Sequence, residues 1–470
     1  MATPTAEHSS PLSGSFRDPS GFVFRRDGVL YRQVNGSYRE HFEQLLASGL
    51  FAFLAAKSLI VDHEDVDLDL RHTDDAWRVI RPRPIPFVSY PYEWSFGQLR
   101  DAALLTLRIQ REALDRGMTL KDASAYNIQF VGCQPVFIDT LSFETYREGR
   151  PWVAYRQFCQ HFLAPLALMS RVDVRLGQLL KPYLDGIPLG LASRLLPWRT
   201  RLSFPLLTHI HLHARSQERY ADKPVKGSSV SVGKLSLIGL LDSLRKAIEG
   251  MEWNPAGTEW ADYYANTNYE PDAMRRKSEI VSEFLDRVGP ATVWDLGANT
   301  GTFSRIASRR GAITIAFDVD PAAVEKNYRD GVRDGERGLL PLVLDATNPS
   351  PGLGWENTER SSLGERGPAD LVMALALVHH LAIGNNVPLE RIARYLAGLG
   401  TWLVIEFVPK EDSQVQRLLA SREDIFGGYD AAGFEAGFRP HFSVVDRQPI
   451  EGTCRTLYLM QVLEPARRPT

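Results

Sequence analysis

The second half of the chain alternates between short apolar runs and amphipathic stretches, which predicts strands and helices in turn. The predicted strands are VWDL at 293–296, ITIAFDV at 313–319, and then LPLVLD, DLVMALAL and TWLVIEFV. Because these runs are apolar almost throughout, they indicate a parallel sheet that is covered on both faces. The last two apolar segments, HFSVV and TCRTLYLMQV, predict a closing antiparallel pair.

The first half has a less regular pattern of the α+β kind. Residues 21–36 predict two short strands, and the Asp-Gly dipeptide at 27–28 between them suits a tight hairpin, in which both central residues have positive φ. Helical composition follows at 38–59, and the apolar content from 151 to 207 predicts further helices. Residues 214–234 lose large apolar side chains and gain Gly, Ser and Lys, which indicates a linker.

These patterns predict the domain organisation of the 470 residues. We expect a disordered tail at 1–20, an α+β domain at 21–213, a linker with a connecting helix at 214–250, and an α/β domain at 251–470. The fold class of the last domain is a doubly wound, Rossmann-like α/β sheet. A composition of 44% hydrophobic and 24% charged residues agrees with an ordinary globular protein of more than one domain.

Charge and cysteine content narrow the classes of partner and compartment. A net charge of −3 does not favour electrostatic binding to the phosphates of a nucleic acid, so we expect no nucleic-acid partner. Three cysteines, far apart, form neither a disulfide framework nor a metal knuckle, which favours a reducing, cytoplasmic compartment. No secretory signal is visible, and the longest apolar stretch, 45–61, is too interrupted for a membrane span.

A glycine-containing loop follows the first strand of the predicted sheet, with the sequence Asp295-Leu-Gly297-Ala-Asn299-Thr-Gly301. Gly297 and Gly301 let the backbone approach a ligand closely, and Asn299 is a residue that tolerates left-handed geometry. The loop does not match the G-x-G-x-x-G pattern of dinucleotide sites, and the carboxylate of Asp295 would repel a pyrophosphate. We therefore expect an adenosine compound that has an ammonium group and no phosphates.

Acidic residues end three successive predicted strands: Asp295, Asp318 and Asp345. A doubly wound sheet binds its ligand at the carboxyl ends of its strands. Asp318 can accept hydrogen bonds from both ribose hydroxyls, and Asp345 can accept one from an adenine amino group. Such an acidic rim suits the cationic S-adenosylmethionine and disfavours NAD or ATP. The alternative is that the three aspartates only cap helices.

On these motifs, residues 255–465 resemble a class I S-adenosylmethionine-dependent methyltransferase. The resemblance implies a cofactor site with Asp295, Gly297, Asn299 and Gly301 at the methionine end, Asp318 at the ribose, Asp345 and Ala346 at the adenine, and Ala374 and Leu375 beneath the sulfonium. The aromatic segment at 260–269, which includes Tyr264, is similar to the lid of such enzymes. The order of these motifs and the later EFVPKEDSQVQRLLASREDIF also resemble the nodulation-protein NoeA type of bacterial methyltransferase.

Candidate catalytic residues follow the fourth and fifth strands of the predicted sheet: His379, His380 and Glu406. Methyl transfer is a displacement at carbon, so positioning supplies much of the acceleration and a base is needed only where the acceptor loses a proton. A histidine at this place can take a proton near neutral pH. The alternatives are histidines that pack on the sheet and cap a turn, and a buried glutamate bonded to a helix terminus.

The first half carries a second candidate site in TLKDASAYNI and PVFIDT. The spacing of Asp122 and Asn127, and Asp139 after an apolar strand, resemble the catalytic loop and the metal-binding strand of the protein-kinase-like fold. In that arrangement Asp122 accepts a hydroxyl proton, while Asn127 and Asp139 hold Mg²⁺ against ATP phosphates. ATP and Mg²⁺ are therefore the ligands that this resemblance implies.

Several departures weaken the hypothesis of an active kinase. Leu120 stands where a histidine is usual, and no glycine cluster covers the phosphates. The only lysine before position 121 is Lys57, inside a predicted helix, so Arg32 would have to replace the strand lysine, with Glu40 or Glu43 as its partner. These departures favour a kinase-like binding or scaffolding domain over phosphotransfer. A chance D-x-x-x-x-N match is the remaining alternative.

Alternating histidines at His209, His211 and His213 would share one side of a strand and could bind a transition metal there. On a helix only His209 and His213 would share a face. No nearby cysteine or acid completes a ligand shell, so we expect no metal.

A basic aromatic surface is predicted around Trp198, where Arg194, Arg199 and Arg201 surround the indole in sequence. Such a surface can meet a membrane or an acidic glycan. The commoner explanation is the solvated end of a helix.

Taken together, the patterns predict a two-domain methyltransferase that uses S-adenosylmethionine. The first domain would recognise the acceptor, a small molecule or a glycan. One alternative is a bifunctional protein with an active kinase-like phosphotransferase domain, and another is a non-catalytic nucleotide-binding scaffold.

Overall fold

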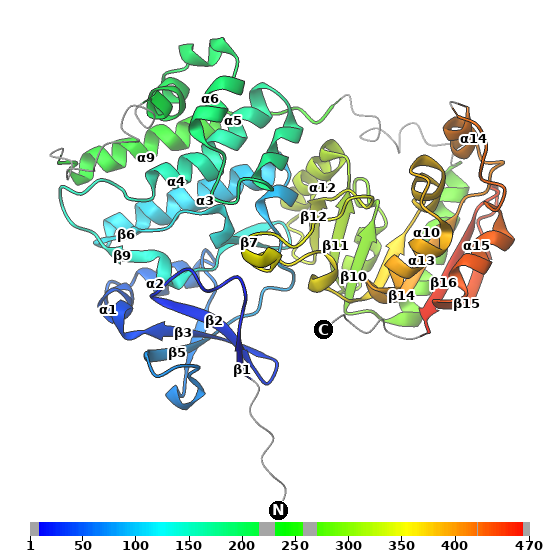
Figure 1. Ribbon diagram of the computed structural model, residues 1–470, viewed down its shortest axis with the longest axis horizontal. Helices are drawn as coiled ribbons and strands as arrows, with labels where there is room; N and C mark the ends of the chain where they lie inside the picture. The colour runs from blue at the N-terminus through cyan, green and yellow to red at the C-terminus, as the bar shows by residue number, and fades with distance from the viewer. Residues whose placement is uncertain (1–8, 216–230, 257–269, 421, 464–470) are drawn as a thin grey trace, which may run out of the picture. The chain divides into compact units, whose positions relative to one another are not determined.

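A computed structural model describes residues 9–215, 231–256, 270–420 and 422–463. The chain divides into two compact units, which are drawn with the chain coloured from blue to red in Figure 1. Unit 1 comprises Met1–Asn254 and Gly352–Arg360, and unit 2 comprises Pro255–Pro351 and Ser361–Thr470. Unit 1 therefore includes a short segment that the chain supplies from the middle of unit 2.

Unit 1 begins with a five-stranded antiparallel sheet in the order β1-β2-β3-β5-β4. Its strands are β1 (Ser9–Pro11), β2 (Gly21–Arg26), β3 (Val29–Asn35), β4 (His63–Val66) and β5 (Ala76–Pro82). The β2–β3 hairpin turns at Asp27 and Gly28, which have φ angles of 51° and 80°, as their sequence predicts. Because β1 pairs with β2, residues 9–11 are ordered where the sequence predicts a disordered tail.

Two short helices, α1 (Arg39–Ala47) and α2 (Leu50–Ala56), cover the segment that the sequence predicts as one helical stretch. Gly49 separates them with a φ of 70°, in the left-handed region that glycine adopts without steric cost. The side chains that join the sheet to α1 form a buried cluster of Val34, Tyr38, Phe42, Ile80 and Leu141.

The rest of unit 1 is mainly helical. Its helices are α3 (Phe96–Asp115), α4 (Tyr155–Phe158), η6 (Cys159–Leu163), α5 (Ala164–Arg171), η7 (Val174–Leu180), α6 (Leu189–Leu195), η8 (Trp198–Leu202), α7 (Phe204–Leu206), η9 (Leu207–Leu212) and α9 (Lys234–Glu249). Two small antiparallel pairs lie among them, β6 (Met118–Leu120) with β9 (Phe143–Thr145) and β7 (Ile128–Val131) with β8 (Gln134–Phe137). Helix α9, which the sequence places in the linker region, packs against α3 within unit 1.

Unit 2 contains a seven-stranded sheet in the order β12-β11-β10-β13-β14-β16-β15. The strands are β10 (Thr292–Leu296), β11 (Ile313–Asp318), β12 (Leu339–Val343), β13 (Ala369–Ala374), β14 (Gly400–Phe407), β15 (Phe442–Pro449) and β16 (Thr456–Val462). The first five pair in parallel, and β16 and β15 add an antiparallel edge. The predicted α/β class with a parallel-rich sheet is thus confirmed.

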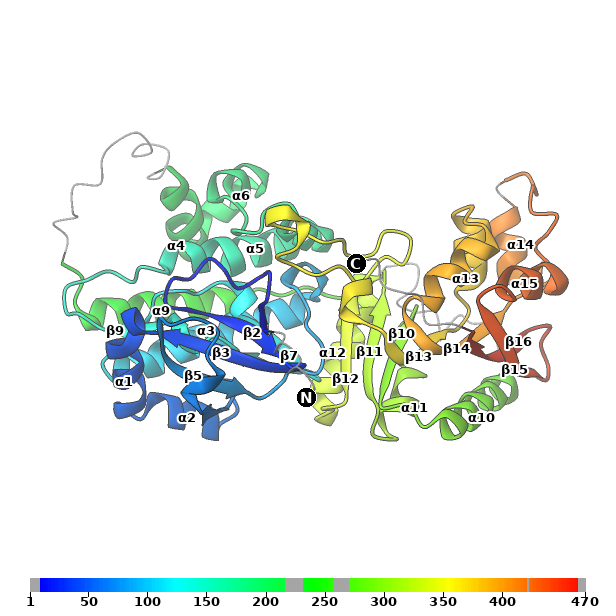
Figure 2. The ribbon, with the colours of Figure 1, turned by 60° about the horizontal axis from the view of Figure 1, so that its bottom comes forward.

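Helices cover both faces of this sheet. They are α10 (Pro271–Val288), α11 (Ser304–Ser308), α12 (Pro321–Asp334), η13 (His380–Gly384), α13 (Leu389–Ala397), α14 (Ser413–Leu419) and α15 (Ala431–Phe438). Figure 2 shows α10 and α11 on one face and α13 and α15 on the other. Among the helices of the described ranges, none has both the length and the apolar character that a membrane crossing requires.

The strand order of unit 2 locates its ligand crevice. The chain runs from β10 outward to β11 and β12, and then returns to β13 on the other side of β10. In a doubly wound sheet, ligands bind outside the carboxyl ends of the strands at such a reversal. The turns after β10 and β13 are close together there, because a Cβ added to Gly297 would lie 3.4 Å from Cδ1 of Leu377.

Candidate cofactor and active site

The loop after β10 has the conformation that its sequence predicts. The φ angles of Gly297, Asn299 and Gly301 are 77°, 51° and 80°, all in the left-handed region. The N–H groups of Gly297 and Ala298 both donate to the carbonyl oxygen of Phe317 on β11, at 2.9 Å. The two turns of backbone at the strand ends are therefore fixed to each other.

Asp295 ends β10 and is buried. Its Oδ2 accepts a hydrogen bond of 2.6 Å from the hydroxyl of Ser304. The pKa of Asp295 is raised to about 7, mainly by burial. Ser304 and Lys277 oppose this rise, and the carboxylate of Asp318 adds to it. Near neutral pH this side chain is only partly ionised, so the acidic rim carries less negative charge than the sequence suggests.

Asp318 ends β11 and braces the glycine loop. Its Oδ2 accepts from the backbone N–H of Asn299 at 2.7 Å, and its Oδ1 accepts from that of Asp320 at 2.8 Å. Burial raises the pKa of Asp318 to about 6, although these two N–H donors lower it. The Asp318 carboxylate is close enough to raise the pKa of Asp295, so two of the three predicted acids lie near each other beside the loop.

The carboxylate of Asp345 bonds to a residue of its own loop. Its Oδ1 accepts from the backbone N–H of Thr347 at 2.8 Å and from the Thr347 hydroxyl at 2.6 Å. The preceding residue, Leu344, donates its N–H to the carbonyl oxygen of Asp318 at 2.8 Å, so the three strand ends lie side by side. Contact of Asp345 and Ala346 with an adenine stays a prediction.

The other predicted cofactor residues lie at the ends of the same strands or outside the described residues. Ala374 and Leu375 are buried at the end of β13, next to the strand that carries the glycine loop. Tyr264 and the rest of the predicted aromatic lid at 260–269 lie outside the described residues. Their contact with a cofactor therefore stays a prediction as well.

Glu406, at the end of β14, is fully buried and lies between two cations. Its Oε2 is 2.6 Å from Nζ of Lys277 on α10, and its Oε1 is 3.3 Å from Nη1 of Arg455. Arg455 also forms two bonds with Asp412, of 2.7 and 3.0 Å. We call Lys277, Glu406, Asp412 and Arg455 the buried ion cluster. The expected alternative for Glu406, a bond to a helix terminus, stays a prediction beside these two ion pairs.

The buried ion cluster is close to the predicted catalytic histidines. Burial lowers the pKa of His379 well below its usual value, and His380, Arg455 and Lys277 lower it further. Burial and Arg455 also lower the pKa of His380 to about 4. The two rings lie 4.1 Å apart between centroids. Both imidazoles are therefore neutral near pH 7, whereas an imidazole of ordinary pKa would titrate there.

His379 also has an unused polar atom. Its Nδ1 is buried and has no hydrogen-bond partner among the described residues. A buried polar atom without a partner is costly and is often completed by a ligand or a water molecule. This feature distinguishes His379 from an imidazole that only packs on the sheet.

Sequence reasoning did not find Ser304, Lys277, Asp412 or Arg455. One signal was available for Lys277, because it interrupts an apolar face of α10. Residues at helical spacing on that face, all buried, are Ala273, Lys277, Ile280, Val281 and Phe284. A charge in such a stripe needs a buried partner. The identity of that partner, Glu406, depends on tertiary packing and not on any local pattern.

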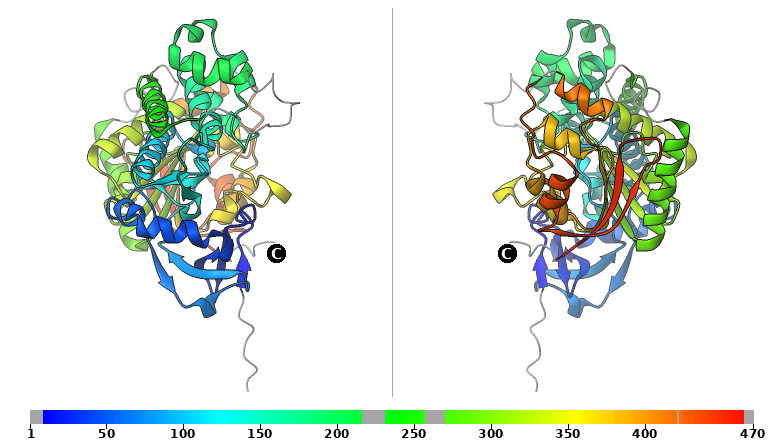
Figure 3. Two further views of the ribbon diagram at one scale, coloured as in Figure 1. Left: turned by 90° about the vertical axis from the view of Figure 1, so that its left-hand side faces the viewer. Right: turned by 90° about the vertical axis from the view of Figure 1, so that its right-hand side faces the viewer.

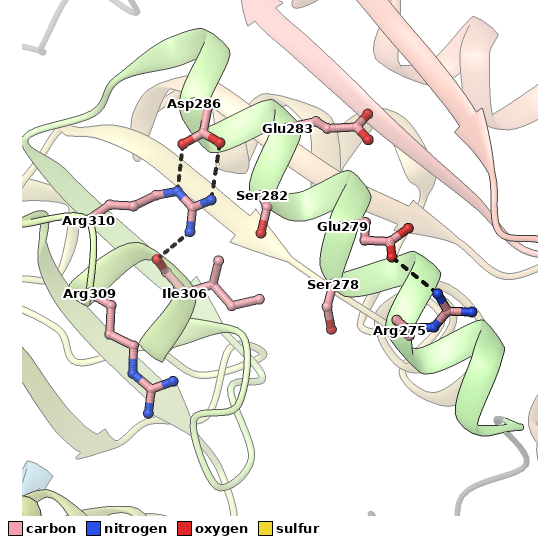
Figure 4. Close-up of a pocket in the computed structure, with 9 residues that line it drawn as sticks. All are labelled: Arg275, Ser278, Glu279, Ser282, Glu283, Asp286, Ile306, Arg309 and Arg310. Carbon is pink, nitrogen blue, oxygen red and sulfur yellow. Dashed lines mark hydrogen bonds and ion pairs between the residues drawn. The ribbon is translucent and has the colours of Figure 1, made fainter.

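The opposite side of α10 borders an open groove, shown in Figure 4. The residues that line it are Arg275, Ser278, Glu279, Ser282, Glu283, Asp286, Ile306, Arg309 and Arg310. Asp286 and Arg310 face each other across it with contacts of 2.6 and 3.1 Å. None of the predicted cofactor or catalytic residues lines this groove, and we assign no ligand to it.

In the candidate site of unit 1, Asp139 forms an ion pair with a residue of the same unit. Arg32 on β3 contacts Asp139, which also accepts from the Ser142 hydroxyl at 2.5 Å. Burial alone would raise the pKa of Asp139, but Arg32 and Ser142 outweigh it and the pKa is lowered. Asn127 donates to the same Ser142 hydroxyl at 3.1 Å. The carboxylate and amide predicted to hold Mg²⁺ are thus engaged within the protein.

The predicted partners of Arg32 are wrong. Glu43 contacts Arg39 on the same helix at 2.9 Å, and Glu40 is exposed on α1. The arginine instead bonds to Asp139 of the apolar strand end. Asp122 lies in the intervening loop, where burial raises its pKa and the Ser124 N–H donates to it at 2.9 Å.

His209 and His211 lie on the helix η9, and His213, the residue after it, is also helical, so none of the three lies on a strand. His209 bonds through Nδ1 to the Tyr155 hydroxyl at 2.7 Å and through Nε2 to the Ser243 hydroxyl at 3.0 Å. His211 bonds through its two nitrogens to the hydroxyls of Ser193 and Thr200, at 2.8 and 2.9 Å. Across the described ranges, no three His, Cys, Asp or Glu side chains gather in a metal-binding arrangement.

Unit 2 is therefore a doubly wound α/β domain with a glycine loop and buried acids at its topological switch point. No protein-family model matches the chain. Among curated proteins, the chain is 37% identical over 462 residues to nodulation protein NoeA of Rhizobium meliloti (strain 1021), and the match covers 96% of each chain. The chain belongs to the NoeA family, in agreement with the resemblance of its motifs.

Comparison with solved structures finds similar chains that cover less than half of this one. Magnesium protoporphyrin IX methyltransferase of Synechocystis PCC 6803, solved with bound SAH, is 16% identical and covers 43% of this chain and 92% of its own, with a TM-score of 0.31. The N-methyltransferase NodS of Bradyrhizobium japonicum WM9 is 12% identical and covers 42% and 99%, with a TM-score of 0.30. The bifunctional kinase-methyltransferase WbdD is 14% identical and covers 43% and 41%, with a TM-score of 0.29.

Proposed function

We propose that unit 2 binds S-adenosylmethionine and transfers its methyl group to a small-molecule or glycan acceptor. The observation that carries this proposal is the bond of 2.7 Å from the N–H of Asn299 to Asp318, which joins the acid of β11 to the glycine loop of β10. It brings two acidic strand ends together at the point where doubly wound sheets bind ligands.

The chemistry of the donor set fits this cofactor. Asp320, two residues beyond Asp318, caps α12 with Oδ1 at 2.8 Å from the Ala322 N–H. Its Oδ2 is buried and has no hydrogen-bond partner within the described ranges. A ribose offers hydroxyl donors to such acceptors, whereas a diphosphate offers only further acceptors and negative charge. Asp318 and Asp320 would hold the ribose, and Asp295 with the glycine loop would meet the methionine end.

S-adenosylmethionine supplies a methyl group that is activated by bonding to a positively charged sulfur. The residues of the chain position the acceptor. His379 is neutral near pH 7 because burial and the cations Lys277 and Arg455 disfavour its protonated form, so it is a weak base that can still accept a hydrogen bond. We assign to His379 the positioning of the acceptor through its unpartnered Nδ1, with His380 against its ring. Glu406 would act by holding Lys277 and Arg455 in place.

Binding measurements test the cofactor assignment. We expect calorimetry on the full-length protein to show binding of S-adenosylmethionine and S-adenosylhomocysteine, and none of NAD. Asp318→Asn should weaken binding about tenfold or more, because a hydrogen bond to a charged group contributes roughly 1.5 to 3 kcal/mol. Asp446→Asn on the edge strand β15 is the matched control and should bind as the wild type does. Tight binding of NAD would overturn the assignment.

Label transfer tests the reaction itself. The protein is incubated with methyl-labelled S-adenosylmethionine and cell extract, and the labelled compound is identified. His379→Ala should lower label transfer by about tenfold, the loss expected when one hydrogen bond that positions the acceptor is removed, with cofactor binding retained. His441→Ala, in the same unit, should have no effect. Full transfer by His379→Ala would remove this histidine from the mechanism.

For unit 1 we propose a kinase-like fold that recognises the acceptor and does not transfer phosphate. The support is the engagement of Asp139 by Arg32 and Ser142, together with the bond between Asn127 and Ser142. Calorimetry with ATP and Mg²⁺ should detect no metal-dependent binding, in the wild type or in Arg32→Ala. Binding that requires Mg²⁺ and disappears in Asp139→Ala would instead establish the phosphotransferase alternative.

A further inference from the structure

A surface of unit 1 exposes large apolar side chains together with arginines. It is built from α6, η8, α7 and η9, and α6 lies at the outer edge of unit 1 in Figures 1 and 3. We call it the Arg–Trp surface, and its exposed side chains are Arg194, Leu195, Trp198, Arg199, Arg201, Leu202, Phe204, Leu212 and Arg215. The exposed fractions of Trp198, Leu202 and Phe204 are 66%, 77% and 73%.

The inward face of this surface combines buried apolar side chains, such as Leu206 and Ile210, with histidines that bond to hydroxyl groups. His211 joins Ser193 on α6 to Thr200 on η8, and His209 joins η9 to Tyr155 and to Ser243 on α9. An ordinary surface segment buries its apolar side chains and exposes its polar ones. This segment buries some of its apolar side chains together with the bonded histidines, and it also leaves Trp198, Leu202 and Phe204 exposed. The inward bonds fix its shape, so turning the apolar side chains inward would break them.

The charge of the segment has one sign. Between Gly186 and Arg215 the sequence contains four arginines and no acidic residue, within a chain whose net charge is −3. The three histidines of the segment add no charge near pH 7, because burial is the main cause that lowers the pKa of each. Arg199 lies over the Trp198 ring at 6.0 Å, so its guanidinium stays beside the apolar side chains.

Large apolar side chains beside arginines are the composition of surfaces that lie in the interface of a bilayer. Trp is favoured at the level of the lipid headgroups, Leu and Phe enter the acyl boundary, and long arginine side chains reach back to anionic headgroups. Each of these requirements is met by an exposed residue of the Arg–Trp surface.

We propose that the Arg–Trp surface docks this protein onto a lipid bilayer that contains anionic lipids. An acidic glycan would pair with the arginines but would leave Leu202 and Phe204 in water. A second copy of this chain, meeting the same surface, would place arginine against arginine. A bilayer with anionic headgroups matches both the charge and the apolar side chains.

Vesicle flotation of the full-length protein tests the proposal. The vesicles contain either phosphatidylcholine alone or an equimolar mixture with phosphatidylglycerol. We expect binding to the mixed vesicles only, weakened by added salt because the attraction is partly electrostatic. Arg199→Gln with Arg201→Gln should weaken binding by about 25-fold, since each arginine near an anionic surface contributes about fivefold. Trp198→Ala should weaken it by about tenfold.

Matched controls separate this surface from general stickiness. Trp355 is exposed to the same fraction as Trp198, 66%, and Trp355→Ala should bind vesicles as the wild type does. Arg147→Gln with Arg150→Gln removes two other exposed arginines of unit 1 and should also have no effect. Circular dichroism confirms that each variant is folded.

Three results would overturn the proposal. One is a wild type that does not float with the mixed vesicles, and another is equal binding by the Trp198 and Trp355 variants. The third is a wild type that forms dimers in sedimentation while Phe204→Ser is monomeric, because a second copy would then cover the surface. A partner protein as occupant would likewise leave the purified chain without affinity for vesicles.

Discussion

Lys277 carries a charge at a position where the rest of its helix face is apolar. Removing one partner of a buried ion pair leaves the other charge without compensation, which costs about 3 to 5 kcal/mol. Glu406 keeps Arg455 as a second partner, so we expect Lys277→Met to lower the free energy of unfolding of unit 2 by about 3 kcal/mol, the low end of this range. Arg275→Met, on the exposed side of the same helix, should change it by less than about 1 kcal/mol.

A double variant tests whether Glu406 is the partner that matters. Urea unfolding of Lys277→Met, Glu406→Gln and the combination gives the coupling between them. The combined loss should be smaller than the sum, since Glu406 bears no isolated charge once both are changed. Additive losses would mean that Lys277 and Glu406 are stabilised separately.

The pKa of Asp295 leads to a prediction on pH. The folded value of about 7 lies above the unfolded value of about 4, so the folded state holds a proton that the unfolded state releases between these pH values. The contribution to stability is complete below pH 4 and is lost as the pH rises through 7. Asp295→Asn resembles the protonated form at every pH. Its stability relative to the wild type should therefore increase from pH 4 to pH 8.

Thermal unfolding of both proteins across this pH range measures the difference. Other titrating groups are shared by the two proteins and cancel in the comparison. A difference that does not change with pH would show that Asp295 is ionised in the folded protein.

At the scale of elements, Gly301 is the point where the glycine loop lies close to α12. Its φ is 80°, and a Cβ at this position would lie 2.5 Å from Nδ2 of Asn327. Gly335 has a similar φ of 66°, but a Cβ there would meet nothing within 4 Å. Both glycines adopt a conformation that disfavours L-residues, and only Gly301 is also sterically confined.

We expect Gly335→Ala to cost about 1 kcal/mol, from backbone strain alone. Gly301→Ala should cost clearly more, and it should also abolish cofactor binding because Asn327 or the loop must move. Differential scanning calorimetry and cofactor titration of the two variants check this. Equal effects of the two substitutions would mean that the packing against Asn327 is soft.

Elements were predictable where the signal is local. The five parallel strands of unit 2 and the hairpin at Asp27 and Gly28 follow from apolar runs and from turn chemistry. The pairing of β1 was missed, because Ser9–Pro11 becomes a strand only through the edge that β2 offers. The histidines of η9 alternate as a strand would, yet they lie on a helix and bond to four other helices.

The site was predictable in part for the same reason. Asp295, Asp318 and the glycine loop follow one another at strand ends, so their proximity is implied by the sheet. The partner of Arg32 was not, because Asp139 is distant in sequence and Glu43 is satisfied by its own helix. Ion pairs between distant segments leave no periodic trace in a single sequence.

At the scale of the whole molecule, the segment Gly352–Arg360 is part of unit 1 although both flanks belong to unit 2. Within unit 1, Glu359 accepts from Arg17 at 2.5 and 2.9 Å and from the Trp355 N–H at 2.6 Å. Arg360 lies over the Tyr126 ring at 4.2 Å. The contacts with Arg17 and with Tyr126 join residues that are more than 200 positions apart in sequence.

Glu359→Gln tests how strongly the bonds of Glu359 hold the segment Gly352–Arg360 in unit 1. The Arg17 bond lowers the pKa of Glu359 to about 2, so its contribution is present above the unfolded value of about 4.5 and is lost as the pH falls through 2. Because Arg17 is largely exposed, we expect a loss of only about 1 kcal/mol at pH 7. Chemical unfolding at pH 7 and pH 2 should show the difference shrinking at the acid end. A constant difference would assign the effect to the Trp355 bond.

The insertion of a unit 1 segment within unit 2 has a consequence for recombination of the gene. Since unit 2 is interrupted by nine residues that complete unit 1, no single breakpoint in the coding sequence yields either unit whole. A recombination event that replaced the coding sequence of residues 1–254 would leave Gly352–Arg360 to pack against a different unit 1. Each unit therefore depends on the continuity of the whole chain, and the match to the rhizobial relative, which covers 96% of each chain, includes both units.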